Sequence, residues 1–341
     1  MLGDLRRYAA ANARVRALLS TLLGRGGLQA LCGYPSSAAV RAALLRTAYG
    51  APPPDAGISD RYLLARVADV GRAVLELLDD PERAFIRQYL LHHEVDSLKI
   101  LIRGVAGHLP SPMLATHLTA WDGIGTIALA KLAGATDPRT LVERLADTAY
   151  GPALHAALHR LDTAGSFALE VSLELDYYDR LWTATATLHA SDRDRARHLL
   201  GILFDILNLS WISRYHALSL SPEEILNYTL RQGRWITLNI RRLLAEQPGT
   251  QWGAVLGSTP YAAFLADAAA RRFDTAAVAL WRFLAGEIQR TLMGYPFHIG
   301  VPLGFLLAQE LEIRDLRVVL AAKSIGVPNA EIIEHLATVR H

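Results

Sequence analysis

The sequence predicts an all-α protein made of three similar helical units. Ala and Leu dominate a chain that is 51% apolar, and both residues favour helix over sheet. Stretches of alternating Val, Ile and Thr, which would indicate strands, are missing from the sequence. One helical signature also occurs three times, at nearly equal intervals, and such repetition indicates three copies of one structural unit.

The three copies of this repeat signature start at Glu94, Asp205 and Glu312, at intervals of 111 and 107 residues. Each copy has an acid at position i, Val or Ile at i+1, a short polar residue at i+3, Leu at i+4 and an apolar residue at i+7. A basic residue follows at i+9 in two copies and at i+11 in the third, where Ala321 occupies i+9. The residues of the signature are Glu94, Ser97, Leu98 and Arg103, then Asp205, Asn208, Leu209 and Arg214, and finally Glu312, Asp315, Leu316 and Lys323.

The spacing of the signature suits a helix that packs along one side. Positions i+1, i+4 and i+7 share a helix face, so each copy presents an apolar stripe. Positions i and i+3 lie together beside that stripe, which places a carboxylate next to Ser, Asn or Asp. The polar pair is either the solvated edge of an amphipathic helix or a hydrogen-bonded cluster that fixes how each unit docks on the next. A carboxylate near an apolar seam is tolerated only when it is paired or hydrogen-bonded.

Breakers and capping residues set the limits of the helices in the first part of the chain. Gly24-Arg25-Gly26-Gly27 is expected to be a flexible break after an amphipathic helix. The consecutive prolines in 51–57 predict a loop, because proline cannot continue a helix. Acids around Pro81 are typical of a helix start. The helices expected here cover residues 4–23, a short stretch after Pro35-Ser36-Ser37, 60–78 and 82–104.

The remainder of the chain is also expected to be helical. Ser221-Pro222-Glu223-Glu224 has Ser at the N-cap, Pro at the first helical position and Glu at the third, which predicts a helix start. Segments rich in Pro and Gly at 104–112, 248–260 and 294–302 predict joints. The expected helices cover roughly residues 139–161, 164–190, 192–215, 222–245, 259–270, 274–292, 298–323 and 328–339.

A proline closes each repeat, at Pro110, Pro222 and Pro328. These prolines lie at i+16 or i+17 of their copies, so the repeats have nearly the same length. We therefore expect one continuous repeat assembly, long enough to bury a substantial core. Its three helical units are expected at residues 1–110, 111–222 and 223–341.

Composition excludes several classes of partner and compartment. The 35 basic and 33 acidic residues give a net charge of +2, so no nucleic-acid partner is expected. The single cysteine, Cys32, excludes an intramolecular disulfide and a cysteine-rich zinc site. The chain starts without the apolar core of a signal peptide. No uninterrupted apolar stretch reaches about 18 residues, so we expect no direct insertion into a membrane.

The sequence offers no catalytic, cofactor or metal site. A nucleotide-binding Walker A loop needs a Gly-Lys pair, but Lys99, Lys131 and Lys323 each follow Leu or Ala. The Gly-x-Ser-x-Gly motif of hydrolases is also missing. His155 and His159 have the i, i+4 spacing of a metal-binding pair but lack the glutamate of the metalloprotease motif, so we interpret them as ordinary histidines. We expect a non-catalytic protein without a cofactor.

Several stretches together resemble one known family. They are the segment from Tyr89 to Arg103, the segment from Pro296 to Lys323, and shorter segments at 8–16 and 220–225. All four resemble the C-subunit family of V/A-type ATPases and ATP synthases, whose counterpart in eukaryotic V-ATPases is the d subunit. The similarity extends from near residue 8 to near residue 336 in the order found in the family, and Ala321 in place of a basic residue is a departure from the repeat.

This resemblance implies an architecture and a role. The three units are expected to surround a pseudo-three-fold axis and form a funnel or socket. The protein is expected to be a central-axis adaptor of a rotary ATPase or ATP synthase that links the central stalk, made of the D and F subunits, to the membrane rotor ring of proteolipid subunits. It is expected to transmit torque for ATP-coupled proton or sodium transport. Its location would be cytoplasmic, peripheral to the membrane through the rotor.

Two other interpretations of the chain stay open at this stage. Asp79-Asp80-Pro81-Glu82 is similar to acid-rich magnesium motifs, so an all-α metal- or diphosphate-dependent enzyme is one alternative. A helix start explains the same acids, and no second acidic motif accompanies them. The other alternative is a generic helical-repeat scaffold for unrelated partners.

Overall fold

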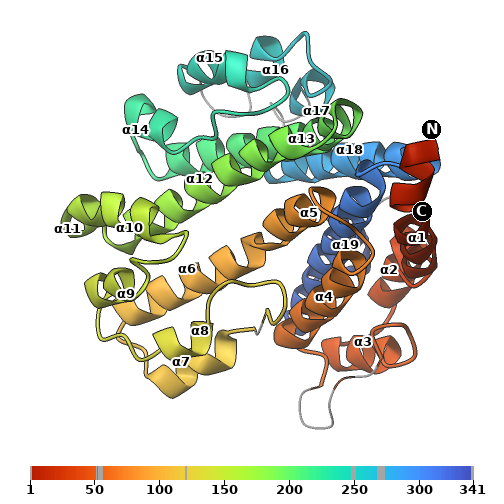
Figure 1. Cartoon of the computed structure of the whole chain (residues 1–341), viewed down its shortest axis with the longest axis horizontal. Coiled ribbons are helices and arrows are strands. Elements are labelled where there is room, and N and C mark those ends of the chain that lie inside the picture. The colour runs from red at the N-terminus through yellow and green to blue at the C-terminus, as the bar shows by residue number, and fades with distance from the viewer. Residues whose placement is uncertain are drawn as a thin grey trace. The chain divides into compact units, whose positions relative to one another are not determined.

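The computed structural model describes residues 2–50, 52, 57–119, 121–246, 251–266 and 273–338. These residues form helices and connecting turns without any strand, so the predicted all-α class is confirmed. The chain divides into two compact units (Figure 1). The larger unit contains Met1–Leu63, Leu77–Asp79 and His189–His341, and the smaller contains Leu64–Glu76 and Asp80–Leu188.

The smaller unit is organised around one long helix, α6 (His92–Ala106). Helix α6 packs against α12 (Ser166–Ala184) and against the shorter helices of this unit (Figure 1). Helix α4 (Asp60–Leu75) leads the chain from the larger unit into the smaller one. The other helices are α5 (Glu82–Leu90), α7 (Ser111–His117), α8 (Leu129–Leu132), α9 (Pro138–Arg144), α10 (Gly151–Ala157), η1 (Leu158–Arg160), α11 (Leu161–Ala164) and η2 (Thr185–Thr187).

The larger unit is built on three long helices that pack on one another. They are α13 (Ala190–Ala217), α18 (Phe273–Met293) and α19 (Gly300–Ser324). The N-terminal helices α1 (Leu2–Leu19), α2 (Gly24–Cys32) and α3 (Ser37–Leu44) all pack on α19 (Figure 1). The short helices are α14 (Pro222–Asn227), η3 (Thr237–Asn239), α15 (Ile240–Leu244), α16 (Trp252–Val255), α17 (Ala262–Ala266) and α20 (Asn329–Glu334).

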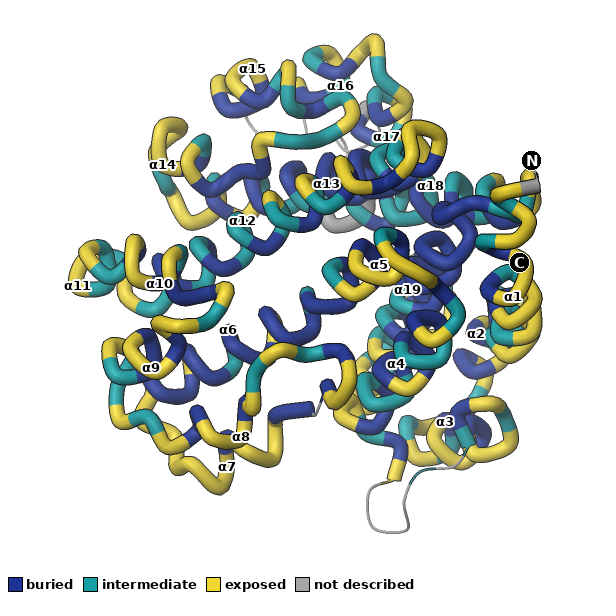
Figure 2. Tube along the Cα trace, in the orientation of Figure 1, coloured by how far each residue is buried: buried dark blue, intermediate teal, exposed yellow. Residues whose placement is uncertain are grey.

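Helices α6, α13 and α19 carry the three copies of the repeat signature, and we call them the core helices. Their apolar stripes are buried (Figure 2). The equivalent leucines Leu98, Leu209 and Leu316 each have 0% of their surface exposed. The apolar face expected from the sequence is therefore the packing face in all three copies.

The core helices also end in the same way. Each has a left-handed residue at i+14 of the signature: His108 with φ 53°, Ser219 with φ 59° and Gly326 with φ 76°. The amide of the next residue bonds back to the carbonyl five residues earlier, which is the hydrogen bond of a Schellman cap. These pairs are Leu109 with Gly104, Leu220 with Tyr215, and Val327 with Ala322. Equivalence of the three helices thus extends beyond the signature itself.

The predicted helix at 82–104 is wrong in one respect, because it is divided into α5 and α6 at Leu91. The Tyr89 carbonyl accepts the Tyr177 hydroxyl at 2.7 Å and lies 2.8 Å from His92 Nδ1. In a continuous helix this carbonyl would accept the backbone amide four residues later. Side chains compete for that position, and the helix breaks there.

Other expected limits are also wrong. The predicted flexible break at 24–27 lies inside α2, which begins at Gly24. The predicted helix at 139–161 is divided into α9 and α10. The predicted helix at 222–245 is interrupted by a non-helical segment between α14 and η3. The short helix after Pro35 is present as α3, with Ser36 as its N-cap. The errors share one cause, described below: side chains of the core helices bind the backbone or the tyrosines of these segments.

Some expectations fall partly outside the described residues. These are most of the proline loop at 51–57, part of the joint at 248–260 and the ends of the helices predicted at 259–270 and 328–339. Within the described ranges, no helix is both long enough and apolar enough to cross a bilayer.

If the three core leucines are equivalent, shortening each should have a similar effect. We expect Leu98→Ala, Leu209→Ala and Leu316→Ala each to lower the free energy of unfolding by about 2–5 kcal/mol, the range for a buried leucine. Arg231→Ala and Arg242→Ala are controls at exposed positions and should change it by no more than about 0.5 kcal/mol. Thermal and urea denaturation measure both. Two leucine variants that melt like wild type would refute the equivalence.

Candidate functional site

The three repeat acids are buried rather than solvated. Glu94 is 1% exposed, and Asp205 and Glu312 are 0% exposed. Each carboxylate accepts hydrogen bonds from backbone amides of a neighbouring loop and from one tyrosine hydroxyl. We call these arrangements the Glu94, Asp205 and Glu312 clusters. Of the two interpretations of the polar edge, the structure shows the hydrogen-bonded one.

The Glu94 cluster lies within the smaller unit. Glu94 accepts the amides of Thr126 at 2.6 Å and Ile127 at 3.0 Å. The Thr126 hydroxyl and the Tyr150 hydroxyl each donate at 2.8 Å to the other carboxylate oxygen. A single side chain on α6 therefore fixes the loop before α8 and the turn before α10.

The Asp205 cluster lies within the larger unit and repeats the arrangement. Asp205 accepts the amides of Arg234 at 3.0 Å, Trp235 at 2.8 Å and Ile236 at 3.2 Å. The Tyr261 hydroxyl donates at 3.0 Å. These three amides hold the segment between α14 and η3 in a non-helical conformation, so the helix expected there is interrupted.

The Glu312 cluster draws its donors from a distant part of the sequence. Glu312 accepts the amides of Leu23 at 3.0 Å and Gly24 at 2.8 Å, and the Tyr49 hydroxyl at 2.6 Å. Leu23 and Gly24 form the N-terminus of α2, where amides lack helical partners and the helix dipole favours negative charge. The carboxylate therefore caps α2, which explains why the glycine-rich 24–27 segment is helical.

Two of the clusters need a glycine beside the carboxylate. A Cβ atom on Gly125 would lie 2.5 Å from Glu94 Oε2, and one on Gly233 would lie 2.3 Å from Asp205 Oδ1. Each glycine directly precedes the first amide donor of its loop. Only a residue without a side chain allows the backbone to approach the acid this closely.

The three tyrosines were missed in the sequence analysis, although they carry a repeat of their own. Tyr49, Tyr150 and Tyr261 each follow a threonine by two residues. In every copy the threonine hydroxyl donates to a leucine carbonyl three residues earlier and accepts the tyrosine amide at 3.2 Å. The Thr-x-Tyr pattern, at intervals of 101 and 111 residues, was the available signal.

The tyrosine of the third copy precedes its acid instead of following it. Tyr150 and Tyr261 both lie 56 residues after their acids, whereas Tyr49 lies 263 residues before Glu312. A search for a fixed offset downstream would therefore find two clusters and miss the third.

The i+3 residues make a second set of contacts, which differ between copies. The Asn208 side chain donates to the Leu230 carbonyl at 3.1 Å and accepts its amide at 2.8 Å. Asp315 accepts the amides of Ala337 and Thr338, with shortest distances of 2.9 and 2.7 Å. Both contacts reach 22 residues along the chain. Ser97 instead donates to the His93 carbonyl of its own helix at 2.9 Å.

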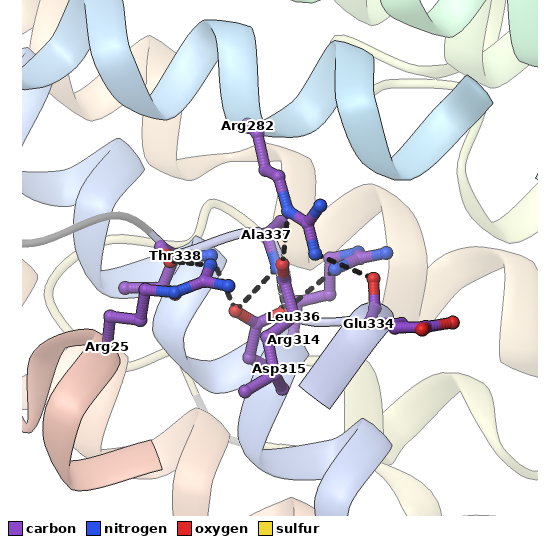
Figure 3. A network of polar contacts seen from close by, with 8 residues as sticks. All are labelled: Arg25, Arg282, Arg314, Asp315, Glu334, Leu336, Ala337 and Thr338. Carbon is purple, nitrogen blue, oxygen red and sulfur yellow. Dashed lines mark hydrogen bonds and ion pairs between the residues drawn. The ribbon is translucent and has the colours of Figure 1, made fainter. Parts of the chain in front are cut away.

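Three arginines lie around Asp315 and the C-terminal segment, one bound to the Asp315 carboxylate and two to carbonyls of the segment (Figure 3). Arg314, the residue before Asp315 on α19, lies 2.8 Å from its carboxylate. Arg282 donates to the carbonyls of Leu336 at 2.9 Å and Glu334 at 2.6 Å. Arg25 of α2 donates to the Thr338 carbonyl at 3.1 Å. Amides and carbonyls of this segment are thus bound by side chains from three different helices (Figure 3).

The basic residues of the signature do not share one role. Arg103 forms an ion pair with Glu170 of α12 at 2.8 Å. Lys323 donates to the Asn329 side chain at the start of α20. Arg214 is exposed. These side chains lie at the surface, where single ion pairs contribute little to stability.

Burial dominates the electrostatics of the clusters. It raises the pKa of Asp205 to about 6, although the amides and Tyr261 favour the ionised form. It also raises the pKa of Glu312. The pKa values of Tyr150 and Tyr261 are raised by burial first and then by the neighbouring carboxylate, so both hydroxyls remain protonated donors.

The clusters are built to hold backbone in place. Both oxygens of each carboxylate face N–H or O–H donors, whereas a metal ligand must direct free lone pairs at the ion. Glu94–Tyr150 and Asp205–Tyr261 each cross one of the unit limits predicted from the sequence. Those limits themselves stay a prediction.

Comparison with known proteins decides the family. A family model described as ATP synthase (C/AC39) subunit matches residues 11–335. The chain belongs to this family. The resemblance to the C-subunit family of V/A-type ATPases is therefore confirmed, over nearly the whole chain.

Relatives of this C/AC39 subunit are found among archaeal proteins, each named as the C subunit of an A-type ATP synthase. The protein from Methanothermobacter thermautotrophicus is 26% identical, over 98% of this chain and 89% of its own length. The one from Methanocaldococcus jannaschii is 24% identical, over 97% of this chain and 86% of its own length. The one from Methanobrevibacter smithii is 29% identical, over 60% of this chain and 54% of its own length.

The raised pKa of Asp205 predicts a pH dependence of stability. A carboxyl whose pKa rises from 3.8 to about 6 on folding stabilises the protein most below pH 4 and loses that contribution as the pH rises through 6. Relative to Asp205→Asn, the wild type should lose on the order of 3 kcal/mol between pH 4 and pH 7. Urea denaturation of both proteins across this range measures the difference.

A matched control is Asp137→Asn. Asp137 is the half-buried N-cap of α9, and hydrogen bonds from Thr140 lower its pKa to about 2. This substitution should leave the slope between pH 4 and pH 7 unchanged. If the wild type instead gains stability over Asp205→Asn as the pH rises, the amide donors outweigh burial and the assigned direction is wrong.

Proposed function

We propose that this protein is the non-catalytic central-axis adaptor of a rotary A-type ATP synthase, placed between the central stalk and the membrane rotor ring. The family match over residues 11–335 carries the proposal, because relatives covered along almost their whole length are named as the C subunit of such a synthase. Its partners would be the D and F subunits of the stalk and the proteolipid subunits of the ring. Its location would be cytoplasmic and peripheral to the membrane.

The repeated clusters support an arrangement around a pseudo-three-fold axis. One acid, one amide-bearing loop and one tyrosine recur three times with nearly the same geometry. Repeated units with the same internal contacts can be related by a rotation. A socket of this kind could bridge a ring of many identical subunits and an asymmetric shaft, because it need not match either partner contact by contact.

The mechanical role fits the way the core is fixed. Torque passes through a protein only when its elements do not slide past one another. The buried clusters bind loops to the core helices with charge-assisted hydrogen bonds, which are stronger and more directional than neutral ones. A carboxylate that holds several amides at once leaves its loop little freedom to move.

The Schellman turns at the ends of the core helices suggest where the ring binds. An exposed apolar residue stands directly beside the left-handed residue in every copy: Leu109 is 43% exposed, Leu218 is 61% exposed and Ile325 is 80% exposed. We assign the turns that carry Leu218 and Ile325, both in the larger unit, to the contact with the ring, whose identical subunits present one surface many times.

Reconstitution tests the adaptor role. The purified protein should bind a detergent-solubilised A-type rotor complex from which the native subunit has been removed, and should restore attachment of the stalk. Association measured by co-sedimentation should weaken at least about tenfold for a Leu218→Ser, Ile325→Ser double variant, since loss of one exposed apolar side chain from an interface costs on the order of 1 kcal/mol.

Leu238→Ser is the matched control for that experiment. Leu238 is 93% exposed but lies in η3, outside the Schellman turns, so its replacement should leave association unchanged. Failure of the wild type to bind would contradict the adaptor role. Binding that is unaffected by the double variant would contradict only the assignment of the turns.

A second prediction follows from the missing Walker A motif. The isolated protein should neither bind nor hydrolyse ATP, because none of its lysines lies in the glycine-rich loop that holds phosphates. Isothermal titration with Mg-ATP should show no saturable heat. The intact ATP synthase complex serves as the positive control, and stoichiometric binding by the isolated chain would contradict the non-catalytic role.

A further inference from the structure

The first fifty residues form a distinct part of the larger unit. They comprise α1, α2, α3 and the turn that contains Tyr49, and we call residues 2–50 the N-terminal strap. All three helices pack on α19, and α2 also packs on α20 (Figure 1). The strap therefore contacts residues that lie far from it in the sequence, within one compact unit.

The strap supplies the hydrogen-bond donors of the Glu312 cluster. In the other two repeats these donors lie in the chain that follows the acid. The loops and tyrosines of the Glu94 and Asp205 clusters lie 29 to 56 residues after the acid. The segment that follows Glu312 binds Asp315 through the amides of Ala337 and Thr338, as Leu230 binds Asn208, whereas the donors to Glu312 lie in the strap. The residues of the strap that donate hydrogen bonds to Glu312 are Leu23, Gly24 and Tyr49.

We propose that the strap completes the third repeat unit, and that this unit opens by releasing the strap while the Glu94 and Asp205 clusters stay closed. The proposal moves the strap from the predicted first unit, 1–110, into the third. It goes beyond the adaptor role, because it identifies the one cluster of the three that is closed between segments far apart in the sequence.

Polar anchors hold the strap along its length. The Tyr8 hydroxyl donates to the buried Asp192 at 2.9 Å, and Arg16 donates to the Leu292 carbonyl. Arg25 donates to the Thr338 carbonyl, beside the Asp315 contacts (Figure 3). Together with the Glu312 cluster, these contacts join the strap to α13, to the end of α18 and to the C-terminal segment.

The long separation in sequence between the strap and Glu312 is the first reason to expect that the strap is released. Its tyrosine lies 263 residues from its acid, whereas the other two tyrosines lie 56 residues from theirs. The chain between Tyr49 and Glu312 contains the other two clusters, so the strap can leave Glu312 while that chain stays folded.

Packing is the second feature. Within the described part of α1 only Tyr8, Ala11 and Val15 are buried, and the rest of this helix faces solvent or is half-covered (Figure 2). Helix α19, on which the strap packs, is buried along most of its length. An element with few buried apolar contacts opens at a lower free energy than the core it covers.

Hydrogen exchange compares the three clusters within one molecule. The amides of Leu23 and Gly24 report on the Glu312 cluster, and those of Trp235 and Ile127 report on the other two. In the native chain, the amides of Leu23 and Gly24 should have protection factors at least about tenfold lower than the other two, because an element with few buried contacts opens more often than the core it covers.

Matched tyrosine variants separate strap release from general destabilisation. Tyr49→Phe should speed exchange at Leu23 and Gly24 only, and Tyr261→Phe should speed exchange at Trp235 without lowering protection of the strap in parallel. Equal protection of the three clusters in the wild type would overturn the proposal. So would a Tyr49→Phe variant in which all clusters exchange faster by the same factor.

A change in connectivity provides an independent test. Head-to-tail cyclisation of the 341-residue chain through a flexible linker gives the strap a second connection, through the C-terminal segment, to the unit from which it is released. Protection of Leu23 and Gly24 should rise toward that of Trp235. Unchanged low protection in the cyclised protein would contradict the proposal, because exchange at Leu23 and Gly24 would then not depend on release of the strap.

Discussion

A carboxylate withdrawn from water and bonded to backbone amides is the constraint on which this fold depends. Ionised groups in a protein interior lose several kcal/mol of hydration, and this loss is offset only by well-placed donors. Asp205 has three amides and a tyrosine hydroxyl around it, and each such charge-assisted bond contributes about 1.5–3 kcal/mol. Cost and gain are of the same size, so the cluster adds little net stability but strongly specifies where its loop must lie.

That specificity suits a C/AC39 subunit of an ATP synthase. Apolar packing of Leu98, Leu209 and Leu316 buries the core helices but is tolerant of small sliding motions. The clusters remove this tolerance, because a carboxylate that moves by about 1 Å loses several hydrogen bonds together. The left-handed turns at the ends of the same helices then leave an exposed apolar residue in each copy. A rigid interior and a repeated surface are what the proposed adaptor role requires.

The repeat signature was sufficient to predict the core but not the partners of its acids. Helical periodicity placed the apolar stripes of α6, α13 and α19 correctly, because the spacing that creates the pattern is a property of a single helix. The partners of Glu94, Asp205 and Glu312 lie in loops whose amides exist at every residue and carry no sequence signal. Only the Thr-x-Tyr turns at Tyr49, Tyr150 and Tyr261 left a trace, and the tyrosine of the third cluster stands before its acid instead of after it.

The sequence by itself determined the all-α class, the threefold repetition and the resemblance to the C-subunit family, since composition, helical period and fixed spacing are local properties. Tertiary structure decided where some of the helices begin and end. The glycine-rich 24–27 segment is helical because Glu312 caps α2, and the 222–245 segment is interrupted because Asp205 and Asn208 bind its backbone. Local propensities differ by less than about 1 kcal/mol per residue, and one buried carboxylate with several donors outweighs them.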